Sequence, residues 1–313
     1  MSSDNGFSNW LEECHSVRMT GLLKNPVFLL LGTGLFLGCL MPLGKLAGEA
    51  GFNPLLWATM IALVPGLCLA AIAGRPACSL ASLARFGFGS GLFAYVIPNA
   101  VLFTAMPHIG SGLAGLMFAL SPVATALISL ALGVRPPSRS LLIAVGFGFV
   151  GAILIVAGRQ SLSLPSAANW LLVALIIPAS LAIGNVYRSA RWPVGATPTQ
   201  VGAASNLLAA PLLFCLCLLQ GGELNFAPFG NNLILVIAQC LASILMFSLF
   251  FRLQVIGGPT YLSQIGYIAA AVGLLAGVGL LGESYPLVVW LGAGLIIAGI
   301  LASFANKPVK PTT

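Results

Sequence analysis

The sequence predicts an all-α integral membrane protein with ten transmembrane helices, arranged as two inverted five-helix repeats. Charged residues make up 6% of the 313-residue chain and hydrophobic residues 59%, whereas a soluble domain carries about 25% charged residues. The few charges lie in short breaks between long apolar stretches. Short sequence motifs also recur between the two halves at a nearly constant offset.

The apolar stretches of the first half accommodate five helices, since a helix crosses a bilayer with about 20 mostly apolar residues. Span 26–44 lies between Lys24 and Lys45, and span 54–73 lies between Glu49 and Arg75. Spans 86–106 and 110–132 share the uncharged stretch between Arg85 and Arg135. Span 140–158 lies between Arg139 and Arg159. We therefore assign residues 26–158 to the first repeat. Residues 1–25, which are polar and can form a short interfacial helix, precede it as a cytoplasmic segment.

The second half repeats this arrangement. Span 169–187 lies between Arg159 and Arg188, span 198–219 between Arg191 and Glu223, span 231–251 between Glu223 and Arg252, span 259–281 between Arg252 and Glu283, and span 286–304 between Glu283 and Lys307. Residues 159–304 are therefore assigned to the second repeat, and residues 305–313 form a cytoplasmic tail.

The basic residues predict the orientation of the chain. With a cytoplasmic N-terminus, 11 of the 13 Lys and Arg residues fall in the cytoplasm, and only Lys45 and Arg159 fall on the other side. Basic loops are retained in the cytoplasm, so both termini are expected there. The net charge of +7 comes from these scattered loops rather than from a cluster. A nucleic-acid partner is therefore not expected.

The two halves match without gaps around the loop between their third and fourth spans. Residues 105–110 and 130–137 correspond to 254–259 and 279–286 at an offset of 149. Because each half holds an odd number of helices, the second half must enter the membrane from the opposite side. Inverted repeats of this kind place a substrate site near the middle of the membrane, between the halves.

A family resemblance follows from these residues. The ten spans in two sets of five, Gly282-Glu283 after the ninth span, Pro286 and the Gly-rich tenth span together resemble the EamA-type transporters of the drug/metabolite transporter superfamily. The resemblance covers residues 26–304. In the first half, Gly133-Val134-Arg135 stands where the family often has Gly-Glu, so Glu283 has no counterpart. The resemblance implies a pore lined mainly by helices 1, 3, 4, 6, 8 and 9, and export or exchange of small metabolites such as amino acids.

Polar side chains within the spans are the candidate substrate-binding residues, because an aqueous cavity needs them at membrane depth. They are Tyr95, Asn99, Ser121, Asn185, Gln239, Ser243, Gln264 and Tyr267. Several are three or four residues apart and therefore share a helix face. Their amide and phenol groups can hydrogen-bond a polar substrate. The alternative is that they hold neighbouring helices together.

Four further residues are candidates for gating or hinge motion. Pro98 and Pro122 lie within spans, where a proline removes a backbone hydrogen bond and kinks the helix. Lys45 and Arg188 occupy equivalent positions in the two halves, at an offset of 143. Their side chains are expected either to extend to the membrane interface or to act in a gate or on an anionic substrate.

The expected function is secondary transport of small metabolites, amino acids or related compounds, by alternating access across the bacterial inner membrane, in the export direction. A channel-like or scaffold protein is the alternative. With two His residues and no acid within a span, the chain offers little to an enzyme mechanism or a metal site, and no cofactor is expected. The same lack of acids favours a uniporter or exchanger over a carboxylate-coupled proton antiporter. The expected partners are a small-molecule substrate and membrane lipid, with the protein a monomer or homodimer.

Overall fold

The computed structural model describes residues 21–102, 105, 117, 120–134, 138–158, 168–221, 224–281 and 286–304. Every regular element in these residues is helical. Six helices among them are long and apolar enough to span a membrane, namely Pro26–Glu49, Pro54–Ile72, Leu80–Leu102, Leu172–Ala190, Pro198–Leu219 and Leu233–Ser263, and shorter apolar helices accompany them. The prediction of an all-helical membrane protein is therefore confirmed.

The first half of the chain runs from a 3-10 turn to the helix α7. Its elements are η1 (Gly21–Lys24), α2 (Pro26–Glu49), α3 (Pro54–Ile72), α4 (Leu80–Gly91), the π-helical turn η2 (Leu92–Val96), α6 (Ser121–Leu132) and α7 (Arg139–Gly158). The second half comprises α8 (Ala168–Ala174), α9 (Ile176–Ala190), α10 (Pro198–Leu219), α11 (Ala227–Asn231), α12 (Leu233–Ser263), α13 (Ile265–Leu281) and α14 (Leu287–Phe304).

Several helices begin where a capping side chain precedes a proline. The Asn25 and Asn53 side chains accept hydrogen bonds of 2.9 Å from the amides of Val27 and Leu55, at the starts of α2 and α3. At α10, Thr197 and Gln200 form a capping box. These caps satisfy backbone amides that lack a partner within the helix, and proline fits the first turn because it has no such amide.

Two helices of the first half extend beyond their predicted boundaries. The span predicted to end at residue 44 continues as α2 to Glu49, and the span predicted to begin at residue 86 begins as α4 at Leu80. Both helices pass through a basic residue, Lys45 or Arg85. A charge marks the edge of the hydrocarbon region, but a long basic side chain does not end a helix.

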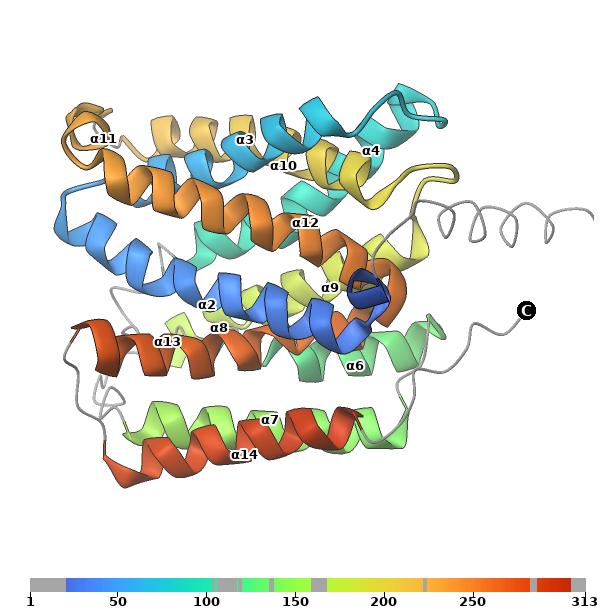
Figure 1. The fold of residues 1–313 in the computed structure, drawn as a ribbon, viewed down its shortest axis with the longest axis vertical. Helices are drawn as coiled ribbons and strands as arrows, with labels where there is room; N and C mark the ends of the chain where they lie inside the picture. The colour runs from blue at the N-terminus through green and yellow to red at the C-terminus, as the bar shows by residue number, and fades with distance from the viewer. Residues whose placement is uncertain are drawn as a thin grey trace, which may run out of the picture.

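The bundle is built of helices that pair across the two halves (Figure 1). Helices α3 and α10 pack together at one end of the long axis, and α7 packs on α14 at the other. Between them, α2 contacts α12 and α13, while α9 contacts α4 and α6. The contact of α4 with α10 likewise has an equivalent in the contact of α12 with α3. The start of α2 and the end of α14 lie at the same, right-hand side of Figure 1.

Glycine allows α2 and α13 to approach closely. A Cβ atom added at Gly34 would lie 2.5 Å from Cβ of Ile268, and one at Gly38 would lie 2.5 Å from Cβ of Val272. Small residues at such crossings are typical of membrane helices, where packing rather than water drives association. On the outside, large apolar side chains such as Ile72 and Leu301 are exposed, as expected of a surface that faces lipid.

Candidate functional site

Four of the predicted spans are interrupted, and these interruptions lie in the middle layers of the bundle. Span 86–106 contains the π-turn η2, a turn at Leu120 precedes α6, a turn at Leu175 separates α8 from α9, and a turn at Gln264 separates α12 from α13. In contrast, α3, α7, α10 and α14 are continuous. Interrupted membrane helices are typical of transporter binding sites, because their free backbone groups must line a cavity or meet another side chain.

The π-turn results from Pro98. The Ile97 amide bonds to the Leu92 carbonyl, which is the long π-helical step. Pro98 has no amide to continue this pattern to the Phe93 carbonyl. The Ser180 hydroxyl of α9 donates to that carbonyl instead, at 2.7 Å. The carbonyl that Pro98 leaves without an amide partner therefore connects the third span to α9 in the second half of the chain.

A glycine bend and a turn shape the region around the ninth span. Within α12, Gly258 has φ 74° and ψ −177°, a conformation that is essentially restricted to glycine. It separates two helical parts of α12 just before Pro259. The second part ends at Ser263, and α13 begins after the turn at Gln264. The predicted eighth and ninth spans are thus joined by a bend rather than a loop.

A buried arginine is the centre of a polar cluster within the described part of the bundle. Arg188, in the last turn of α9, is only 1% exposed. Its Nη2 donates to Asn185 Oδ1 at 2.5 Å, its Nε to Gln254 Oε1 at 3.3 Å and its Nη1 to Ser90 Oγ at 3.5 Å. The guanidinium carbon lies 5.0 Å from the centre of the Phe250 ring. We call Arg188, Asn185, Gln254 and Ser90 the Arg188 cluster.

Further hydrogen bonds extend the cluster over four helices. Gln254 Nε2 in α12 donates to Ser189 Oγ at 2.7 Å and to the Asn185 carbonyl at 3.2 Å. Asn185 Nδ2 donates to Thr125 Oγ1 of α6 at 3.2 Å. Since Ser90 belongs to α4, the cluster connects α4 and α6 of the first half with α9 and α12 of the second.

Neutral groups surround the charge of Arg188 in the described part of the chain. Glu49 is the one acid among the described residues, and it is exposed at the end of α2. Burying a cation without an anion costs several kcal/mol, even after relaxation. The expectation that the Arg188 side chain extends to the membrane interface is therefore wrong. The alternative, a role in a gate or on an anionic substrate, agrees with its burial.

Tyr95 and Asn99 are placed differently from each other, although they are four residues apart. The centre of the Tyr95 ring lies 5.5 Å from the centre of the Phe247 ring, which in turn lies 6.4 Å from the centre of the Phe250 ring. Phe250 packs against the guanidinium of Arg188. The buried Tyr95 hydroxyl has no hydrogen-bond partner among the described residues. Asn99 instead donates its amide to the Tyr95 carbonyl at 2.6 Å. Tyr95 is thus available to a ligand, whereas the Asn99 amide supports the interrupted helix.

Gln239 and Gln264 are both buried with amide groups that lack partners. Both side-chain polar atoms of Gln239, and Nε2 of Gln264, have no hydrogen-bond partner within the described residues. Ser243, which shares a face with Gln239, donates to the Gln239 carbonyl at 2.7 Å and so is satisfied locally. Unsatisfied buried amides are costly, so these two glutamines are the stronger ligand candidates in α12 and at the start of α13.

The other candidates have structural roles or lie outside the site. The Tyr267 hydroxyl donates to the Val145 carbonyl of α7 at 3.1 Å, which favours the helix-packing alternative. Ser121 is buried as the first residue of α6, and Pro122 follows it in the first turn. Pro122 therefore begins a helix rather than kinking one. Lys45 lies within α2, and its side chain and Glu283 lie outside what the structure describes.

Sequence reasoning missed Ser90 and Gln254. Ser90 lies in the span 86–106, but a single serine in an apolar helix gives no distinct signal. Gln254 lies between the predicted spans 231–251 and 259–281, whereas α12 continues through both Arg252 and Gln254. The match of residues 254–259 to the first half was the signal that could have directed attention to Gln254.

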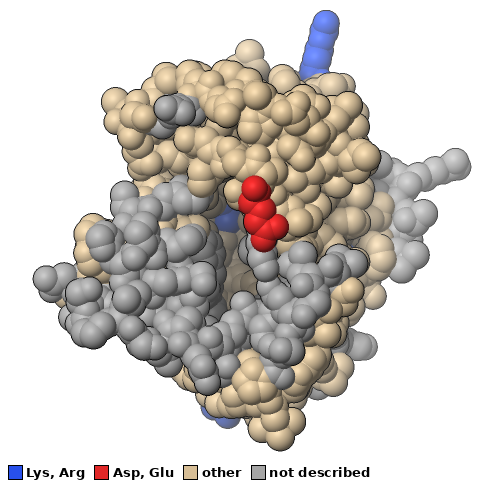
Figure 2. Space-filling view, turned by 90° about the vertical axis from the view of Figure 1, so that its left-hand side faces the viewer, with Lys and Arg blue, Asp and Glu red and all other residues tan. Residues whose placement is uncertain are grey.

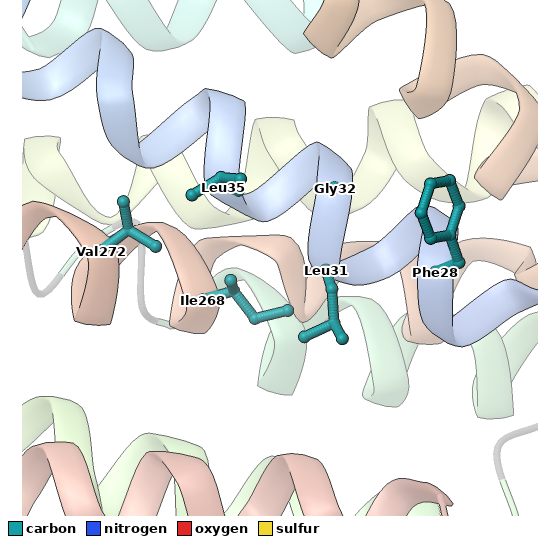
Figure 3. Close-up of a pocket in the computed structure, with 6 residues that line it drawn as sticks. All are labelled: Phe28, Leu31, Gly32, Leu35, Ile268 and Val272. Atoms are coloured by element: carbon teal, nitrogen blue, oxygen red, sulfur yellow. The ribbon is translucent and has the colours of Figure 1, made fainter.

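Two surface depressions are lined mainly by apolar residues, although Asn231 and Asn232 line the second. One pocket of about 370 Å³ lies between α2 and α13 and is lined by Phe28, Leu31, Gly32, Leu35, Ile268 and Val272 (Figure 3). Another of about 600 Å³ lies between the end of α2 and the start of α12. The face at the left of Figure 1 is hollowed, with acidic atoms at the rim and basic atoms inside (Figure 2).

Comparison with known proteins agrees with this architecture. The model of the EamA-like transporter family matches residues 24–157 and again residues 168–305, once in each half. The uncharacterized inner membrane transporter YedA of Escherichia coli K12 is 27% identical over 228 residues, covering 71% of this chain and 72% of YedA. YedA of E. coli O157:H7 matches to the same extent.

A solved structure described as a crystal structure of a protein has the same fold. It superposes with a TM-score of 0.70 at 19% identity, over 89% of this chain and 97% of that one. At this identity the likeness concerns the fold alone. Together with the two family matches, which cover both halves, these findings establish that the chain belongs to the EamA-like transporter family of the drug/metabolite transporter superfamily.

Proposed function

We propose that this protein is a secondary transporter that exports small metabolites, amino acids or related compounds, across the bacterial inner membrane by alternating access. Its family supports transport, and the name of YedA supports the inner membrane as the location. The compound is neutral or anionic, because the buried charge in the described part of the site is the cation Arg188.

The two halves act as inverted repeats. Their contacts are the same when the halves are exchanged. Helix α3 packs on its counterpart α10, and α7 packs on its counterpart α14. The contacts of α2 with α12 and α13 correspond to those of its counterpart α9 with α4 and α6. A two-fold axis in the plane of the membrane accounts for this exchange. In this arrangement both termini are cytoplasmic, in keeping with the basic loops.

The observation that supports transport most strongly is the meeting of interrupted helices at buried polar groups between the halves. The π-turn, α6, α9 and α12 converge on the Arg188 cluster, and the Ser180 bond to Phe93 joins the halves beside it. A permanently rigid bundle gains nothing from leaving buried amides such as those of Gln239 and Gln264 without partners. A substrate that passes between the halves supplies the missing partners in turn, because Gln239 lies about four turns from Gln254 of the cluster along α12.

The remaining candidates take supporting roles in this proposal. Pro98 acts as the hinge next to the π-turn, and Asn185 orients Arg188 through its Oδ1. Lys45 is the sequence counterpart of Arg188 in the first half. In inverted repeats the two halves exchange conformations, so Lys45 is expected to act at the opposite gate.

The test is counterflow in proteoliposomes. Vesicles loaded with unlabelled amino acids or other metabolites, one class at a time, should accumulate the same labelled compound transiently and with saturation. Gln264→Leu should lower the rate at least tenfold because the amide no longer meets the substrate. Gln220→Leu, at an exposed site after α10, should leave it unchanged. Flux that rises linearly with concentration and shows no counterflow would establish a channel instead.

A further inference from the structure

We propose that the Arg188 cluster binds a carboxylate group of the transported compound. The inference rests on the proposed transport function and narrows its substrates to monocarboxylates and amino acids with an apolar body. Three features support it within the described residues: donors on the guanidinium without a partner, a charge without a counter-ion, and an adjoining aromatic wall with an unpartnered hydroxyl.

The guanidinium of Arg188 has donors left over. Of its five N–H groups, one each on Nε, Nη1 and Nη2 bonds to Gln254, Ser90 and Asn185. One N–H therefore remains on each terminal nitrogen without a partner among the described residues. A pair of N–H groups on neighbouring nitrogens matches the two oxygens of a carboxylate. The neighbouring side chains fix the plane of the guanidinium, so the fork is already oriented.

The charge of Arg188 requires an anion more than it requires further neutral partners. Amide and hydroxyl oxygens orient the guanidinium but leave its positive charge uncompensated, and within the described residues Glu49 is the one acid, exposed at the end of α2. A cation that is 1% exposed is costly until an anion arrives. A substrate carboxylate that pairs with Arg188 removes this cost, which favours binding of anions over their neutral analogues.

Aromatic rings next to the cluster suit an apolar substrate body. The Phe250 ring lies below the guanidinium, and the rings of Phe247 and Tyr95 follow it at centroid separations of 6.4 Å and 5.5 Å. The Tyr95 hydroxyl is buried and unpartnered within the described residues. It is a further donor for a carboxylate oxygen or a substrate amide.

The cluster also has a point at which it can open. The bond from Arg188 Nη1 to Ser90 Oγ, at 3.5 Å, is the longest of the three guanidinium contacts, and it crosses from α9 to α4 of the other half. Such a long bond contributes little. Separation of α4 from α9 would break it first, and the freed Nη1 would then face the opening. In the conformation described, the Arg188 side chain is almost fully buried.

The experiment compares acids with their neutral amides. Purified protein in detergent, at constant chloride, is mixed with amino acids and with aliphatic and aromatic monocarboxylates, each beside its primary amide, and thermal unfolding is followed. We expect at least one acid to raise the melting temperature by about 2 °C or more, and its amide to have no such effect. Arg188→Gln should weaken binding of that acid at least tenfold.

Matched variants separate binding from folding. Arg191→Gln removes an exposed arginine three residues away and should bind the acid as the wild type does. Tyr95→Phe removes a hydroxyl without a described partner, so it should fold normally and bind severalfold more weakly. Arg188→Lys retains the charge but not the fork, and its affinity should fall between those of the wild type and Arg188→Gln.

Several results would overturn the carboxylate site. They are equal stabilisation by an acid and its amide, undiminished binding in folded Arg188→Gln or Tyr95→Phe, and stabilisation by chloride alone without any effect of a carboxylate. Failure of every carboxylate to stabilise the wild type has the same meaning. If the wild type still shows saturable counterflow of a neutral compound, only the carboxylate site is refuted. If it shows no counterflow at all, the transport function fails.

Discussion

Replacing Gln254 with leucine should destabilise the protein strongly, because this side chain holds three hydrogen bonds within the bundle. It accepts from Arg188 Nε at 3.3 Å and donates to Ser189 Oγ at 2.7 Å and to the Asn185 carbonyl at 3.2 Å. Leucine has a similar volume, so packing changes little. The loss includes one bond to a buried charge and leaves that donor unsatisfied.

The expected cost is about 2 to 4 kcal/mol. Bonds to charged groups contribute about 1.5–3 kcal/mol and neutral ones less, and values measured in membrane bundles lie at the low end. The assay is equilibrium unfolding in mixed micelles with increasing SDS. Gln220→Leu, the same substitution at an exposed position, should change the free energy of unfolding by less than about 0.5 kcal/mol. Equal stability of the two variants would refute the role assigned to Gln254.

The remaining predictions use the same unfolding assay. Gly148→Ala places a Cβ 2.3 Å from the Tyr267 ring and should cost about 1–3 kcal/mol, whereas Gly146→Ala, where a Cβ meets no described atom within 4 Å beyond its own helix backbone, should be nearly neutral. Tyr267→Phe should cost about 0.5–1 kcal/mol through loss of the bond to Val145 and leave counterflow intact; lost counterflow would restore Tyr267 to the binding site. Gly258→Ala, at φ 74°, should cost about 1–3 kcal/mol, and Gly266→Ala in open space should cost much less.

Much of the fold could be predicted from where the charges are absent. Uncharged stretches of about 20 residues located the helices, and the motifs shared by the halves predicted a duplicated chain, in agreement with the two family matches. Helix ends were predicted less well, as the continuation of α2 past Lys45 and of α12 past Arg252 demonstrates. Hydropathy reports the thickness of the hydrocarbon region, whereas hydrogen bonding and caps determine where a helix ends.

The site could be predicted in part. Polarity at membrane depth identified Tyr95, Asn185, Gln239 and Gln264, all of which lie in or near the middle layers of the bundle. It could not distinguish Tyr267, whose hydroxyl is used in packing on α7, because the partner lies 122 residues away in sequence. Nor could it predict that Arg188 is buried, since a charge next to a loop has the same sequence pattern whether it faces water or another helix.

The central claim is that the two halves open in turn on opposite sides of the membrane around the polar groups between them. In a cysteine-free background, Ser90→Cys reports on the Arg188 cluster and Gln239→Cys on the second turn of α12, near the other end of the bundle. Their reaction with membrane-impermeant maleimides, added from either side of oriented vesicles, tests this claim directly. We expect each cysteine to react from one side of the membrane only, and the two cysteines to react from opposite sides. A transported compound that raises the reaction rate of one cysteine should lower that of the other. Reaction of both cysteines from the same side would contradict alternating access. So would reaction of both cysteines in the presence of a transported compound that does not change their rates in opposite directions.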